Sequence, residues 1–201
     1  MLDDQTILRQ RGAGAALHHI TTLWKQTTLP TEVASQLSHI SVQHDIRNVV
    51  IIATNGDAVL ARVAQQLMQP YMAVTVLCCE AAAMPSFVDA HSLVIIIEAG
   101  ILPDQVKNIL RYTQQHAALA ILLTHDAAAA EYATVYPAAT VVPVAKREGQ
   151  VEPLRILSTL SALLTAYQLL DDDLVEAIAD GAANAAQQWG AAVPTAHNLA
   201  K

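Results

Sequence analysis

The stretch NVVIIA at residues 48–53, followed by Thr54, Asn55, Gly56 and Asp57, decides the fold of this chain. It is a short and almost wholly apolar run, rich in β-branched residues, that ends at a glycine-containing turn. Four more runs of this kind follow at residues 73–78, 93–97, 119–124 and 140–144. Short runs that are apolar at nearly every position predict strands buried on both faces.

Helical segments are expected between most of these strands, at residues 57–69, 103–116 and 126–135, whereas residues 80–91 form an irregular Ala/Met/Pro segment. Strands that alternate with helices are typical of a parallel sheet with right-handed crossovers. The sequence therefore predicts an α/β fold, a doubly wound, five-stranded parallel sheet flanked by helices.

The expected organisation has four parts. Residues 1–47 are an N-terminal helical segment packed on the domain, with one helix starting at Thr31, and residues 48–145 are the α/β core. Residues 146–190 are C-terminal helices, one of them over residues 153–170, and residues 191–201 are a tail or a linker to an absent second domain.

The composition excludes several classes of protein. The 201 residues are 53% hydrophobic and 14% charged, yet no apolar run approaches the roughly 20 residues that a membrane helix needs. The net charge of −7 argues against a nucleic-acid partner, because phosphate neutralisation needs clustered cations. The start of the chain has no pattern of an export signal, and the only cysteines, Cys78 and Cys79, are adjacent. These features predict a cytoplasmic protein without disulfides.

Ligands of parallel sheets usually bind beyond the carboxyl ends of the strands, so the residues after each strand are the candidates. Asn55, Gly56 and Asp57 follow the first strand, and Glu98 and Gly100 follow the third. The Asp57 carboxylate can cap the helix that starts here and repel a phosphate. Together with Asp104, Asp57 and Glu98 could form an acidic cluster, although all three could equally be solvated or cap helices.

His125 after the fourth strand is a candidate acid or base, and Asp126 beside it reads most simply as a helix cap. The cations nearest the expected crevice are Lys146, Arg147 and Arg155, of which we carry Arg155 forward as a ligand contact. No nucleophile–base pair and no metal motif can be recognised, so we predict no cofactor or metal and name no catalytic residue. Asp171, Asp172 and Asp173 are interpreted as the start of a helix rather than as a metal site.

Several segments, in this order and spacing, resemble one enzyme family. They are Leu2-Asp3-Asp4, Arg47-Asn48-Val49-Val50, Met84-Pro85-Ser86-Phe87-Val88, Glu152-Pro153-Leu154-Arg155 and Asn198-Leu199-Ala200-Lys201. The chain resembles the N-terminal half of the bifunctional phosphoglucose/phosphomannose isomerases, which belong to the sugar isomerase (SIS) superfamily. The resemblance implies a flavodoxin-like SIS fold, a sugar or sugar-phosphate ligand, and a homodimer or pairing with a second SIS domain.

The phosphate loops depart from the family pattern. The family's Gly-x-Gly-Gly-Ser corresponds to residues 53–57 here, and its Ser-x-Ser-Gly-x-Thr corresponds to residues 97–102, where Glu98 and Ala99 precede Gly100. The family's phosphate-binding hydroxyls are missing at the matching positions, and its catalytic glutamate and histidine lie in or near the second domain. The leading interpretation is a degenerate SIS domain that binds a carbohydrate derivative or a partner without catalysis. The alternative is half of a glucose-6-phosphate/mannose-6-phosphate isomerase, which interconverts aldose and ketose phosphates.

Overall fold

The structure is a computed structural model that describes residues 29, 31–81, 84–124, 126–144, 146–147, 150–151, 153–171, 173–174, 176–178, 180–181 and 184. Residues 29–170 form one compact unit, and the few described helical residues after position 170 belong to another. The predicted N-terminal segment before residue 29 and the predicted tail at residues 191–201 lie outside the described residues. None of the described helices is both long and apolar enough to cross a membrane.

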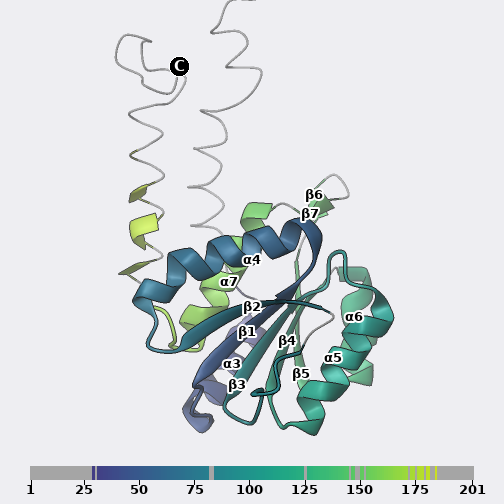
Figure 1. Ribbon diagram of the computed structural model, residues 1–201. Coiled ribbons are helices and arrows are strands. Elements are labelled where there is room, and N and C mark those ends of the chain that lie inside the picture. Colours follow the sequence, from purple (N-terminus) through teal and green to yellow (C-terminus); the bar gives the residue numbers. More distant parts are fainter. Residues whose placement is uncertain are drawn as a thin grey trace, which may run out of the picture. The chain divides into compact units, whose positions relative to one another are not determined.

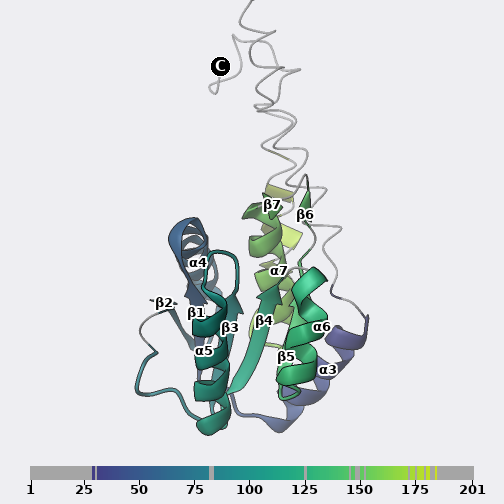
Figure 2. The same cartoon turned by 90° about the vertical axis from the view of Figure 1, so that its right-hand side faces the viewer.

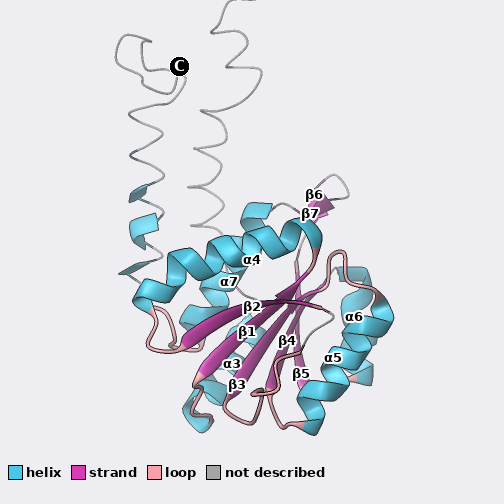
Figure 3. Cartoon of the chain, in the orientation of Figure 1, coloured by secondary structure: helices cyan, strands magenta, loops and turns pink. Residues whose placement is uncertain are grey.

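The core is a five-stranded sheet with the order β2-β1-β3-β4-β5, and all of its strand pairs are parallel (Figures 1 and 3). The strands are β1 (Asn48–Ala53), β2 (Thr75–Glu80), β3 (Ser92–Ile97), β4 (Leu119–Thr124) and β5 (Ala139–Pro143). Their inner positions are almost all buried, because helices cover both faces of the sheet. The predicted doubly wound, five-stranded parallel fold is confirmed.

The helices form two layers. The crossover helix α4 (Asn55–Met68) packs on β1 and β2 and against α7 (Pro153–Ala166), which in turn contacts α3 (Thr31–Gln43). The helices α5 (Pro103–Gln115) and α6 (Asp126–Val135) pack near β4 and β5. Figure 2 views the molecule from the side of α5 and α6, which lie in front of the strands.

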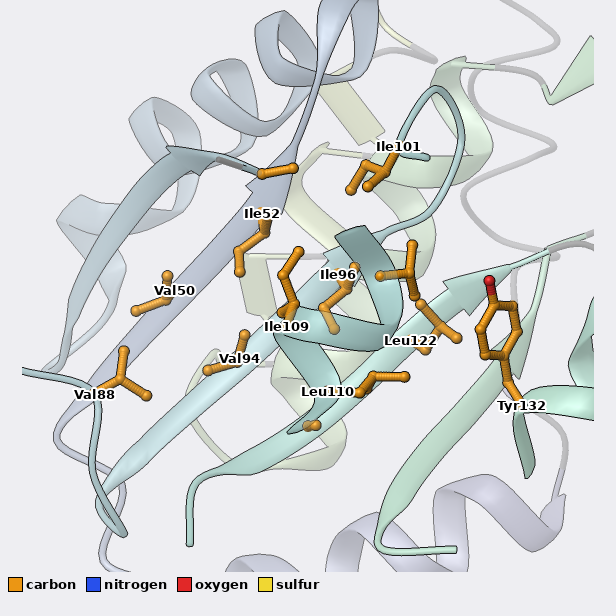
Figure 4. Close-up of a cluster of buried hydrophobic side chains, with 13 residues drawn as sticks. Val50, Ile52, Val88, Val94, Ile96, Ile101, Ile109, Leu110, Leu122 and Tyr132 are labelled. Carbon is orange, nitrogen blue, oxygen red and sulfur yellow. The ribbon is translucent and has the colours of Figure 1, made fainter. Parts of the chain in front are cut away.

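Side chains on alternate strand positions build the core beneath α5 and α6. A continuous cluster joins Val50 and Ile52 of β1, Val94 and Ile96 of β3 and Leu122 of β4 to the two helices (Figure 4). Successive strand residues point to opposite faces, so residues at even positions of β1, β3 and β4 share this side. The same alternation places the next even residue after β3, Glu98, on the side of α5 and α6.

Several element boundaries differ from the prediction, the largest difference being the end of α7, which was predicted at residue 170 and lies at Ala166. The helix predicted from residue 57 begins at Asn55, and β2 lies two residues later than the predicted strand at 73–78. The shift of β2 has a local cause in the glutamines that precede it. Gln69 bonds the carbonyl of Val74 (3.0 Å) and the amide of Val76 (2.7 Å), and Gln65 donates to the carbonyl of Val76 (2.6 Å). Side chains therefore form hydrogen bonds with the backbone groups at the point where the strand begins.

One element was missed. A short antiparallel pair, β6 (Lys146–Arg147) and β7 (Gln150–Val151), lies between β5 and α7, within the range predicted to be helical. A two-residue strand is too short to show a hydrophobic period, so the sequence carries no signal for it.

Candidate functional site

The carboxyl edge of the sheet has a switch point between β1 and β3. The chain leaves β1 towards β2 and leaves β3 in the opposite direction towards β4, so the two crossover helices lie on opposite faces. Parallel α/β sheets bind ligands beyond the carboxyl ends of the strands at such a point. The loops concerned are residues 54–57 and residues 98–102, the two glycine-containing turns singled out from the sequence.

The two loops touch each other. A Cβ atom added to Gly100 would lie 3.1 Å from both Asn55 Nδ2 and Thr54 Oγ1, which is closer than side chains normally pack. Gly100 has φ +82° and Asn55 has φ +53°, so both adopt the left-handed conformation. Glycine adopts it without strain, and asparagine tolerates it better than most residues do. The structure thus brings together Asn55 and Gly100, both predicted site residues, by a contact that depends on a missing side chain.

Thr54 is a site residue that sequence reasoning did not single out. It precedes α4 with an extended backbone (φ −132°, ψ 162°), but its side chain makes no capping hydrogen bond. Its Oγ1 atom is buried and has no hydrogen-bond partner among the described residues. A threonine directly before a helix is a recognisable capping signal, so the sequence could have drawn attention to it.

Asp57 is the third residue of α4 and not its cap. The helix begins two residues earlier, and no hydrogen bond of the Asp57 carboxylate is present within the described part of the chain. The expectation that Asp57 caps the helix is therefore wrong, because the first helical hydrogen bond runs from the Ala58 amide to the Thr54 carbonyl (3.3 Å), which makes Thr54 the N-cap residue. The side chain is half-buried, and this burial raises the pKa of its carboxyl group. It still places a negative group in the first turn, where the helix dipole favours one.

Glu98 is the best-fixed charged group at this edge. Its amide donates to the carbonyl of Leu123 (3.0 Å), which continues the ladder between β3 and β4 by one residue. Its carboxylate accepts hydrogen bonds from the Thr124 hydroxyl and from the Tyr132 phenol. Figure 4 shows Tyr132 of α6 with its hydroxyl turned towards the end of the strands where Glu98 follows β3.

The surroundings of the Tyr132 phenol change its pKa. Burial, followed by the charge of Glu98 and the hydrogen bond to it, raises the pKa of Tyr132 to about 12. A neutral phenol that donates to a carboxylate is thus the stable state at neutral pH. Three elements, β3, β4 and α6, therefore hold one carboxylate beside the switch point.

Two other candidates, Asp104 and Arg155, lie in the first turns of α5 and α7. Asp104 is exposed in the first turn of α5. The amide of Leu102, the residue before this helix, donates to the side chain of Gln105 (Oε1, 3.3 Å) and not to Asp104. Within the described residues, no three His, Cys, Asp or Glu side chains gather closely enough to hold a metal ion. Arg155 is the third residue of α7 and is half-buried.

Three further candidates are His125, Lys146 and Arg147. His125 lies outside the described residues. Lys146 and Arg147 form the short strand β6, and only their backbone is described. A role of these residues in ligand binding stays a prediction.

Solved structures with a similar fold carry phosphosugar isomerase names. A Clostridium difficile protein assigned as a phosphosugar isomerase matches at a TM-score of 0.59 and 10% identity, over 87% of this chain and 52% of that one. A Bacillus subtilis protein assigned likewise matches at 0.56 and 13% identity, over 79% and 52%. A Listeria monocytogenes protein assigned as a sugar-phosphate isomerase matches at 0.56 and 12% identity, over 92% of both chains.

The match thus spans about half the length of the Bacillus and Clostridium chains but nearly all of the Listeria chain. No protein-family model and no curated protein matches the sequence. Identities of this size show the fold alone and do not reach the bifunctional phosphoglucose/phosphomannose isomerases in particular. The chain has the sugar isomerase (SIS) domain fold that these solved structures share.

Proposed function

We propose that the crevice between residues 54–57 and 98–102 binds a carbohydrate derivative without a phosphate group, and that the chain alone does not isomerise sugar phosphates. The observation that carries the proposal is the carboxylate of Glu98, fixed by Thr124 and Tyr132 at the switch point. A fixed carboxylate beside the loops changes which ligands the crevice favours.

A phosphate is disfavoured for two reasons. The hydroxyls that would bind it are replaced by Asp57, Ile97, Ala99 and Leu102, and each charge-assisted hydrogen bond that is lost costs about 1.5–3 kcal/mol. Asp57 and Glu98 also add negative charge, which repels a dianion. The backbone turn that would bind an anion is retained, but the side chains around it now disfavour one.

Sugar hydroxyls are favoured instead. An ionised carboxylate only accepts hydrogen bonds and has about four lone-pair sites, two of which are used by Thr124 and Tyr132. The remaining sites can accept bonds from the hydroxyls of a sugar ring or from a sugar amine. The exposed Asn55 amide, which lies against Gly100 of the loop that holds Glu98, supplies both a donor and an acceptor.

Calorimetry on the full chain tests the ligand class. Glucose, mannose and glucosamine are titrated beside glucose 6-phosphate, mannose 6-phosphate and fructose 6-phosphate. We expect heat of binding only in the first group, and micromolar binding of any of the three phosphates would overturn the proposal.

A variant with family hydroxyls restored makes the test of phosphate binding more specific. Asp57→Ser, Ala99→Ser and Leu102→Thr together return hydroxyls to three of the family's four positions, and all three residues are half-buried or exposed, whereas the fourth, Ile97, is buried. We expect this triple variant to bind sugar phosphates at least about tenfold more tightly than the wild type. The control is Val135→Thr, an exposed apolar-to-hydroxyl change on α6, which should leave phosphate binding unchanged.

The second candidate function is one half of a glucose-6-phosphate/mannose-6-phosphate isomerase. It is supported by the fold likeness to structures named as phosphosugar isomerases and by the half-length match to two of them. An isomerase assay on the chain, alone and mixed with a separately produced second SIS domain, decides between the two. Turnover in either case would favour the isomerase, and none in both would leave a binding domain.

A further inference from the structure

The strand β2 forms one edge of the sheet. Within the described part of the chain it pairs with β1 alone, at the end of the order β2-β1-β3-β4-β5 (Figure 1). In an extended strand, the N–H and C=O of one residue point to the same side, and those of the next residue point to the opposite side. Every second residue of β2 therefore directs its backbone groups away from β1, where a further strand could pair with them.

Two glutamine side chains occupy the first of these outward groups. Gln69, which begins the 3₁₀ helix Gln69–Tyr71 after α4, donates to the Val74 carbonyl (Nε2 to O, 3.0 Å) and accepts from the Val76 amide (N to Oε1, 2.7 Å). Gln65 of α4 donates to the Val76 carbonyl (Nε2 to O, 2.6 Å). Both backbone groups of Val76 are thus bonded to side chains, which places Val76 among the residues that point away from β1.

The hydrogen bonds of Gln69 follow the pattern of an added strand. In a parallel pair, a residue donates to one carbonyl of the neighbouring strand and accepts from the amide two residues further along. Gln69 makes this pair of bonds with Val74 and Val76 through a single side-chain amide. Gln65 stands four residues before Gln69, so both lie on one face of a helical segment that packs on β2.

The sequence of β2 offers little protection of its own. Proteins commonly keep further strands from a free edge by placing lysine or proline there. The other edge strand, β5, ends in Pro143, which has no backbone N–H to donate. The strand β2 has the sequence TVLCCE, which contains neither residue and has its only charge at Glu80, the last position. Protection of this edge must therefore come from outside the strand.

We infer that Gln65 and Gln69 form a glutamine clamp that blocks the first half of the β2 edge to strand addition. The strand that is excluded is an extended segment of another chain, β2 of a second copy included. The clamp lies at the amino end of β2, whereas the loops of the proposed ligand site follow the carboxyl ends of β1 and β3. The inference is therefore independent of the proposed function.

Hydrogen exchange of the full chain, followed residue by residue by NMR, tests the bonds of the clamp. An edge amide that points to solvent exchanges quickly, whereas a hydrogen-bonded amide is protected. We expect the Val76 amide to exchange at least about tenfold faster in Gln69→Ala than in the wild type. Gln66→Ala changes an exposed glutamine of the same helix and should leave the Val76 rate unchanged. Equal Val76 rates in the wild type and Gln69→Ala would overturn the inference.

Light scattering at tens of micromolar tests the consequence for association. We expect the scattering of Gln65→Ala/Gln69→Ala to grow with time, whereas that of the wild type and of Gln66→Ala stays constant. Adding Thr75→Lys to the double variant places a lysine at an exposed position of the edge and should stop this growth without restoring the bonds. Constant scattering of the double variant would overturn the inference. Growth that the lysine does not stop would also overturn it, because the aggregation would then arise from unfolding.

Discussion

Gly100→Ala tests whether the contact between the two site loops needs a glycine. The alanine would sit at φ +82°, where an ordinary residue costs about 1–2 kcal/mol. Its Cβ would also press on Asn55 Nδ2 and Thr54 Oγ1 at 3.1 Å, and the buried Thr54 hydroxyl has little room to retreat. Alanine lowers the entropy of the unfolded chain and so returns about 0.4–1 kcal/mol. We expect a net loss of about 1–2 kcal/mol in the free energy of unfolding.

Gly56→Ala is the matched control one loop away. Gly56 lies in the first turn of α4, and a Cβ atom there would meet nothing within 4 Å. Alanine in a helix is favoured over glycine by up to about 1 kcal/mol, so this variant should be as stable as the wild type or more stable. Urea unfolding followed by circular dichroism measures both variants. The reasoning fails if Gly100→Ala matches the wild type, or if Gly56→Ala loses as much stability.

Three further outcomes follow from the buried groups. Tyr132→Phe removes a donor to the Glu98 carboxylate and should cost about 1.5–3 kcal/mol in urea unfolding, whereas Tyr71→Phe on the surface should cost nothing measurable. The folded-state pKa of Tyr132 is raised from 10.0 to about 12, so the wild type should lose stability as pH rises between these values, and Tyr132→Phe should lose less over that interval. Partial burial, first, and the neighbouring Cys79 raise the pKa of the half-buried Cys78 thiol to about 11. Iodoacetamide at pH 8 should therefore modify Cys78 more slowly in the folded chain than in urea, and equal rates would contradict this protection.

The strands and the two site loops were accessible from the sequence because their signals are local. Each strand in the middle of the sheet is a compact apolar run, and the predicted bounds of β1 and β4 agree with the structure. The edge strand β2 was misplaced because the side chains of Gln65 and Gln69, on the preceding helical segment, bond backbone groups of Val74 and Val76 at its start. A propensity pattern carries no information about such a side-chain bond.

Only some residues of the site could be predicted from the sequence, again because sequence signals are local. Glu98 and Gly100 stand at a strand end and could be singled out, but the partner of Glu98 on α6 could not. Tyr132 has the sequence pattern of an ordinary core residue, and only the packing of α6 near β4 and β5 turns its hydroxyl to the carboxylate. The contact of Thr54 with Gly100 could not be predicted, because it depends on the absence of a side chain at Gly100.

The alternation of the strands explains why a carboxylate can persist at this edge. Position 98 continues the even-numbered side of β3, the side on which Thr124 ends β4 and Tyr132 rises from α6. Two hydroxyl donors on separate elements offset part of the cost of partly burying the charge. A carboxylate held at this edge adds negative charge that disfavours a phosphate, whereas its open lone-pair sites can accept hydrogen bonds from a neutral, hydroxyl-rich ligand. The proposed ligand preference therefore follows from the position of Glu98 at the end of the strand, and it requires no change in the fold.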